Sequence, residues 1–127
     1  MLYNNILLID DDREDSAVFL QAVQSLSRDI ICRVDNNTVK AIENLRDSVI
    51  LPDLLFLDLN MPAVSGLDFR RRLRDDQRLK DIPVILYSNY SKEAAEQLSL
   101  INDSDQFISK PHSYEAMVEI LRNIIKP

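Results

Sequence analysis

Acidic, hydroxyl and amine side chains stand at the ends of four short apolar segments of this sequence. In chain order they are Asp10-Asp11-Asp12, Asp58, Ser88 and Lys110. If the apolar segments are parallel strands, their carboxyl ends meet at one edge of the sheet, which is where open α/β proteins bind their ligands. We therefore expect an acidic site that holds one hydroxyl and one ammonium group at that edge.

The charge of this group indicates a metal site. Asp10, Asp11 and Asp58 would repel one another in a single pocket. Lys110 cancels one of the three negative charges, and the two that remain would be cancelled by one divalent cation. Because all the expected ligands are oxygens, the sequence predicts Mg²⁺ as the cofactor.

Five strand-like segments alternate with five segments of helical period. The strand-like segments are 6–9, 30–34, 54–57, 84–87 and 107–108, and they resemble strands that are buried on both faces of a parallel sheet. The helical segments carry apolar stripes with three- and four-residue spacing. These stripes are Phe19, Ala22, Val23 and Leu26; Val39, Ile42, Leu45 and Val49; Phe69 and Leu73; Ala94, Ala95 and Leu98; and, after Ser113 as N-cap, Tyr114, Met117, Val118, Leu121, Ile124 and Ile125. Strict alternation predicts an α/β fold, a doubly wound five-stranded parallel sheet with helices on both faces.

Length and composition exclude several classes of protein. The 127 residues have room for one domain, and we expect residues 1–127 to form it without an output domain. The single glycine, Gly66, cannot build a Gly-rich phosphate loop. One cysteine, Cys32, and one histidine, His112, cannot make a Cys/His zinc site.

Charge and the N-terminal segment bear on partners and location. A net charge of −6 disfavours direct binding to nucleic acid. The N-terminal segment has no basic region, and its apolar run ends in three aspartates, so no signal peptide or membrane span is expected. A lone thiol fits a reducing compartment, and we expect a cytoplasmic protein.

The ordered motifs ILLIDDD, LLFLDLNMP followed by Gly66, ILYS and FISKP resemble the receiver domains of two-component response regulators. The resemblance covers essentially the whole chain. It implies a flavodoxin-like sheet of strand order 2-1-3-4-5. It also implies a signalling protein that catalyses only its own phosphorylation and dephosphorylation, with Asp58 as the phosphoacceptor for a phosphohistidine.

The resemblance assigns further roles by position. Mg²⁺ would be held by Asp11, by Asp58 and by the backbone carbonyl of Asn60, with Asp10 acting mostly through water. Lys110 would neutralise charge on the phosphoryl group. The remaining roles are those of the switch residues Ser88 and Phe107, of Asn60 and Tyr90 in setting the lifetime of the phosphate, and of a cis Lys110–Pro111 bond that aims the lysine.

The resemblance also implies partners. A sensor histidine kinase or a histidine phosphotransfer protein would supply the phosphoryl group, and a downstream protein effector would read the switch. Homodimerisation would use the face formed by helix four, strand five and helix five.

Three other interpretations were weighed against the receiver. A phosphatase of the haloacid-dehalogenase type needs an acid two residues after its nucleophile, where this chain has Asn60. An EF-hand loop that begins at Asp10 would place Asp15 where glycine is needed and Gln21 where glutamate is needed. A receiver-like interaction module that is never phosphorylated would lack an acid, the hydroxyl or the lysine, and none of these is missing.

Overall fold

The computed structural model describes residues 3–37, 39–59, 66–102 and 104–125. Five parallel strands form one sheet in the order β2-β1-β3-β4-β5, which confirms the predicted fold class and strand order. The strands are β1 (Asn5–Ile9), β2 (Ile31–Asp35), β3 (Leu54–Asp58), β4 (Val84–Ser88) and β5 (Gln106–Ser109). The helices are α1 (Arg13–Leu26), α2 (Ala41–Asp47), α3 (Gly66–Asp75), α4 (Lys92–Gln97) and α5 (Tyr114–Ile125).

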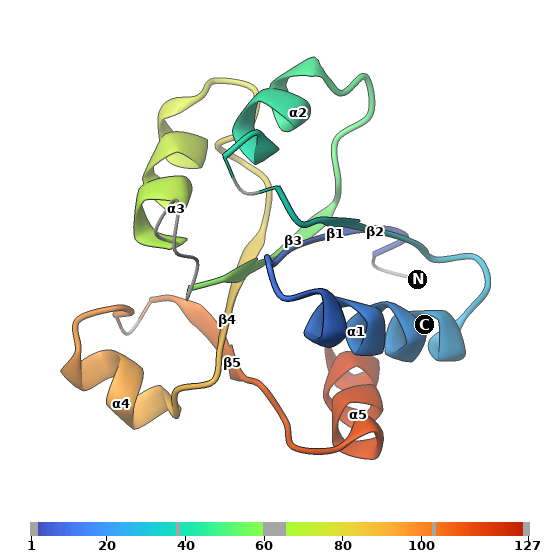
Figure 1. Cartoon of the computed structure of the whole chain (residues 1–127). Coiled ribbons are helices and arrows are strands. Elements are labelled where there is room, and N and C mark those ends of the chain that lie inside the picture. The colour runs from blue at the N-terminus through green and yellow to red at the C-terminus, as the bar shows by residue number, and fades with distance from the viewer. Residues whose placement is uncertain (1–2, 38, 60–65, 103, 126–127) are drawn as a thin grey trace.

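Helices cover both faces of the sheet, as Figure 1 shows. On one face, α1 and α5 pack against alternate strand residues, with Phe19 and Leu121 touching the cluster around Phe56 and Tyr87. On the other face, α2, α3 and α4 cover the intervening strand residues, whose side chains point the opposite way; Leu57 is an example. The three central strands therefore have side chains buried on both faces, and their apolar runs do not alternate for this reason.

Side-chain caps fix where three of the helices begin. The Asp12 carboxylate accepts a hydrogen bond from the backbone N–H of Asp15 at 3.0 Å, and α1 begins directly after Asp12. Ser91 and Ser113 accept from backbone N–H groups three residues on, each at 3.1 Å, at the starts of α4 and α5. The predicted Ser113 cap is thus confirmed, and each cap stabilises its helix by about 1 kcal/mol.

The second helix is shorter than its apolar stripe predicts. Val39 and Val49 lie outside α2 and are 59% and 93% exposed. The Ser48 hydroxyl donates to the Asn44 carbonyl, and the Arg78 guanidinium donates to the carbonyls of residues 46, 48 and 49. The bonds to the carbonyls of residues 44 and 46 satisfy two of the last carbonyls of the helix, and the bonds to residues 48 and 49 hold the chain that follows it.

The two edge strands depart from the expectation of burial on both faces. Ile31 at the start of β2 is 59% exposed, and both ends of β5 are exposed. An edge strand has a neighbour on one side only, so its side chains receive less cover. Cys32 on β2 is still shielded enough that burial raises the pKa of its thiol to about 12.

Candidate functional site

The carboxyl ends of the two central strands bring the predicted acids together. Asp10 follows β1, Asp58 ends β3, and these strands are neighbours, with Ile9 beside Leu57. Asp10, Asp11 and Asp58 each offer a carboxylate oxygen within 4.8 Å of the other two. The structure therefore builds the acidic group that the sequence predicted.

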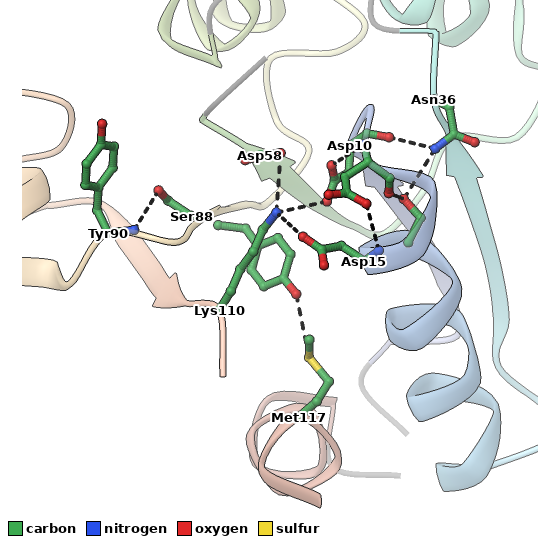
Figure 2. A network of polar contacts seen from close by, with 11 residues as sticks. Asp10, Asp15, Asn36, Asp58, Ser88, Tyr90, Lys110 and Met117 are labelled. Atoms are coloured by element: carbon green, nitrogen blue, oxygen red, sulfur yellow. Dashed lines mark hydrogen bonds and ion pairs between the residues drawn. The ribbon is translucent and has the colours of Figure 1, made fainter. Parts of the chain in front are cut away.

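Lys110 joins this group from the loop after β5. Its Nζ lies 3.2 Å from Asp10 Oδ2 and 3.5 Å from Asp58 Oδ2 (Figure 2). A third carboxylate, Asp15 on the first turn of α1, is nearer still at 3.0 Å. The ammonium group is thus surrounded by three acids, and the sequence had assigned it only two of them.

Burial governs the protonation of this site. Asp10 is fully buried, and desolvation raises its pKa to about 7. The Asp12 N–H lowers this pKa, the charge and hydrogen bond of Asp58 raise it, and the Lys110 charge lowers it. Burial lowers the pKa of Lys110, but the nearby charges of Asp58, Asp10 and Asp15 raise it by more than burial lowers it. The pKa of Lys110 is therefore above its ordinary value. Lys110 therefore stays protonated and positively charged, whereas burial disfavours the ionised form of Asp10.

The acidic group fits a hard divalent cation. It offers only carboxylate oxygens, and three carboxylates with one lysine leave two negative charges at a site where burial raises the pKa of Asp10. A divalent cation beside these oxygens would favour their ionised forms. The expected carbonyl ligand and lifetime residue Asn60 lies outside the described residues.

Ser88 ends β4 beside the acidic group. It is fully buried, and in the β3–β4 pairing Asp58 lies opposite its neighbour Tyr87. The Ser88 Oγ accepts a hydrogen bond from the backbone N–H of Tyr90 at 3.1 Å. The Tyr90 side chain is 40% exposed, and its hydroxyl points away from Lys110 in Figure 2.

Phe107 lies beside β4 within the sheet. It pairs with Leu86 and packs, partly buried, against the cluster under α2, α3 and α4. The described structure therefore places the two predicted switch residues on neighbouring strands. Ser88 lies at the acidic site, and Phe107 packs against the cluster that includes residues of α4.

The expected cis bond before Pro111 is wrong. The structure contains no cis peptide bond among the residues it describes, so Lys110–Pro111 is trans. The trans form of an X–Pro bond is favoured by about 0.5–1 kcal/mol, so a sequence alone gives cis no general advantage. The lysine is aimed by other contacts: its backbone N–H donates to the Ser88 carbonyl at 2.7 Å, and its Nζ lies 5.0 Å from the centre of the Tyr87 ring.

Three supporting residues escaped the sequence analysis. Asp15 contacts Lys110, and Asn36 donates to the Asp10 carbonyl at 2.8 Å. Tyr87 places its ring under Lys110 and its hydroxyl 3.8 Å from the Met117 sulfur. The signal for Asp15 was available, because a residue on the first turn of a helix after a strand faces the same edge of the sheet as the strand end.

Comparisons with known proteins agree with this geometry. A family model described as the response regulator receiver domain matches residues 6–122. The polar-differentiation response regulator DivK of Brucella anthropi is 25% identical over 121 residues, which cover 95% of each chain. The phosphorylated cyanobacterial phytochrome response regulator RcpA has the same fold, with a TM-score of 0.82 and 23% identity over 98% of this chain and 92% of that one. The Mn²⁺-bound response regulator Rcp1 matches with a TM-score of 0.76 and 21% identity, and the match covers 95% of this chain and 91% of that one. The chain therefore belongs to the response regulator receiver domain family.

Proposed function

We propose that this receiver domain is a phosphoacceptor switch in which Asp58 takes a phosphoryl group from a phosphohistidine. The observation that carries the proposal is the meeting of Asp58 with two further acids, a lysine and a buried serine at one edge of the sheet. Membership of the receiver family makes the chain a signalling protein, not an enzyme that turns over a separate substrate.

The proposed transfer is one displacement at phosphorus. A carboxylate oxygen of Asp58 forms a bond to phosphorus while the P–N bond of the donor breaks, and the electron pair of that bond leaves with the imidazole nitrogen. Such transfers need alignment and neutralised charge more than covalent help. Mg²⁺ held by Asp10, Asp11 and Asp58 would supply two positive charges beside the phosphoryl oxygens. The Lys110 ammonium adds one more from the β5 side.

Ser88 and Phe107 suit the role of reporting the phosphorylated state. The Ser88 hydroxyl sits at the end of the strand next to Asp58 and would donate a hydrogen bond to a phosphoryl oxygen. A shift of Ser88 would loosen its bond with the Tyr90 N–H and so disturb the chain that leads to α4. Partial burial leaves Phe107 room to change rotamer, and this would remodel the face of α4, β5 and α5.

The partners follow from this mechanism. A sensor histidine kinase or a histidine phosphotransfer protein would act as donor, and a protein effector or a second copy of the chain would bind the remodelled face. Among the described residues, no helix combines the length and apolar character that a membrane crossing needs. We place the switch in the cytoplasm, where a lone thiol stays reduced.

Intact mass after incubation with acetyl phosphate tests the proposal. We expect one phosphoryl adduct on the wild type in Mg²⁺, and none with EDTA or on Asp58→Asn. An adduct that survives Asp58→Asn would move the acceptor elsewhere. No adduct, together with no binding of beryllofluoride, would favour the alternative of an interaction module that is never phosphorylated.

Tyr90 is expected to protect the phosphate, because its backbone N–H is bonded to the Ser88 hydroxyl and its partly exposed ring is large enough to cover that side of the site. Tyr90→Ala should shorten the lifetime of the phosphoryl group on Asp58 by severalfold, measured as loss of the mass adduct after acetyl phosphate is removed. Tyr3→Ala, at a tyrosine before the start of β1 and so at the opposite end of that strand from Asp10, is the control. An unchanged lifetime in Tyr90→Ala would remove the shielding role.

A further inference from the structure

The nearest partner of Lys110 is an acid outside the predicted metal group. The Nζ lies 3.0 Å from Asp15 Oδ2, against 3.2 Å for Asp10 and 3.5 Å for Asp58. The Asp15 side chain is 40% exposed, whereas the other two carboxylates are almost completely buried. Figure 2 shows Asp15 approaching the ammonium group from α1.

Asp15 is held in this place by its helix. Its backbone N–H donates to the Asp12 carboxylate, which caps α1, so the residue sits in the first turn. A helix N-terminus favours a negative side chain, so an aspartate is well suited to this position beside the lysine. Among the described residues, the acids close enough to share a cation are Asp10, Asp11 and Asp58, and Asp15 is outside that group.

The ammonium group has three protons and three carboxylate partners. A phosphoryl group on Asp58 would add oxygens that compete for those protons. Asp10 and Asp58 would share their charge with a bound cation, but Asp15 would keep its full attraction for the lysine. Lys110 can therefore turn fully to a phosphoryl group only when its contact with Asp15 weakens.

We propose that Asp15 is a positioning residue that restrains Lys110 in the unphosphorylated arrangement and so opposes the phosphorylated state. The proposal rests on the function proposed for Asp58. Because Asp15 is partly exposed, its ion pair with Lys110 should be of moderate strength. Loss of this ion pair should favour the phosphoryl-bound state by about fivefold. The residue would set the threshold at which the switch responds to its donor.

Beryllofluoride, a stable mimic of the phosphoryl group, is the probe for the first measurement. In Mg²⁺, we expect Asp15→Asn to bind it about fivefold more tightly than the wild type. Glu14→Gln is the matched control, because it removes the same charge from an exposed acid on the same turn of α1. The effect of Asp15→Asn should vanish in a Lys110→Met background, as a role through the lysine requires.

A second measurement needs no metal. In EDTA, the ¹⁵N order parameter of the Lys110 ammonium group should fall in Asp15→Asn and stay unchanged in Glu14→Gln. Asp15→Ser gives the same comparison with a smaller side chain. Equal beryllofluoride affinity for the wild type and Asp15→Asn would overturn the role of Asp15 alone. No binding by any variant, with no adduct from acetyl phosphate, would overturn the phosphoacceptor proposal and this one with it.

Discussion

The Asp58→Asn protein should take up no phosphoryl group and yet unfold at a higher temperature than the wild type in EDTA. The cause is repulsion between buried acids that the wild type accepts for its function. Asp58 is 2% exposed, lies in the acidic group with Asp10 and Asp11, and raises the pKa of Asp10 by its charge. An amide in its place keeps the shape of the side chain and removes that charge.

The size of this gain depends on two opposing contacts. The substitution removes the attraction between Asp58 and Lys110, and among the nearby charges Asp58 raises the pKa of the lysine most. Asp15 and Asp10, whose oxygens lie 3.0 Å and 3.2 Å from Nζ, nevertheless keep the ammonium paired. The relief of repulsion should therefore win by about 1 kcal/mol, a typical gain where a functional site carries uncompensated charge. For a domain of this size, that corresponds to a rise in Tm of about 4 °C.

Calorimetry in EDTA and then in Mg²⁺ would test the balance. Binding of Mg²⁺ to the native state stabilises the wild type by mass action, whereas Asp58→Asn has lost a ligand and is stabilised less. The difference in Tm between the two proteins should therefore narrow or reverse in Mg²⁺. Asp81→Asn, which neutralises an exposed acid before β4, controls for the net charge of −6. A lower Tm for Asp58→Asn in EDTA would mean that the attraction to Lys110 outweighs the repulsion.

The acidic site could be predicted from the sequence because its position depends on few variables. In a parallel sheet the residue after each apolar run reaches the same edge, whatever the details of the helices. Asp10, Asp58 and Ser88 needed only the ends of three central strands, and those ends are marked by a change from apolar to polar residues. The structure confirms each of these strand ends.

Other features depended on long-range contacts. The sequence could have placed Asp15 at the right edge of the sheet, but not its pairing with Lys110. The link from Asp15 to Lys110 joins residues 95 positions apart and requires both the phase of α1 and the reach of a long side chain. The early end of α2 depends on Arg78, which comes from the loop after α3. Exposure of β2 and β5 follows from their places in the strand order, which segment composition does not contain.

The sequence does not explain why glycine stands at position 66, but the structure gives a physical reason. It is the first residue of α3 and lies against the end of β3. A Cβ atom added there would stand 2.8 Å from both Cα and Cδ2 of Leu59 and 3.0 Å from the carbonyl oxygen of Asp58. Two of these three atoms belong to the backbone, so the clash cannot be relieved by a side-chain rotation alone.

Gly66→Ala should therefore destabilise the protein, although alanine is the better helix former. Inside a helix, alanine is more stabilising than glycine by up to about 1 kcal/mol. This advantage is smaller in the first turn, where the backbone N–H groups make no hydrogen bonds within the helix. Forcing an extra methyl group into a packed position costs about 1–3 kcal/mol. We expect the clash to win and the free energy of unfolding to fall by about 2 kcal/mol.

Urea unfolding would measure the loss, with Arg72→Ala on the exposed side of the same helix as the control. The second consequence concerns the site, since the nearest atoms are the backbone of Leu59 and the carbonyl of Asp58 itself. Relief of the clash has to move α3 away from β3 or turn the end of β3, and either movement disturbs the carboxylate beside Lys110. Folded Gly66→Ala should accordingly bind beryllofluoride more weakly than the wild type. Stability and affinity both equal to those of the wild type would show that the start of α3 yields without touching Asp58.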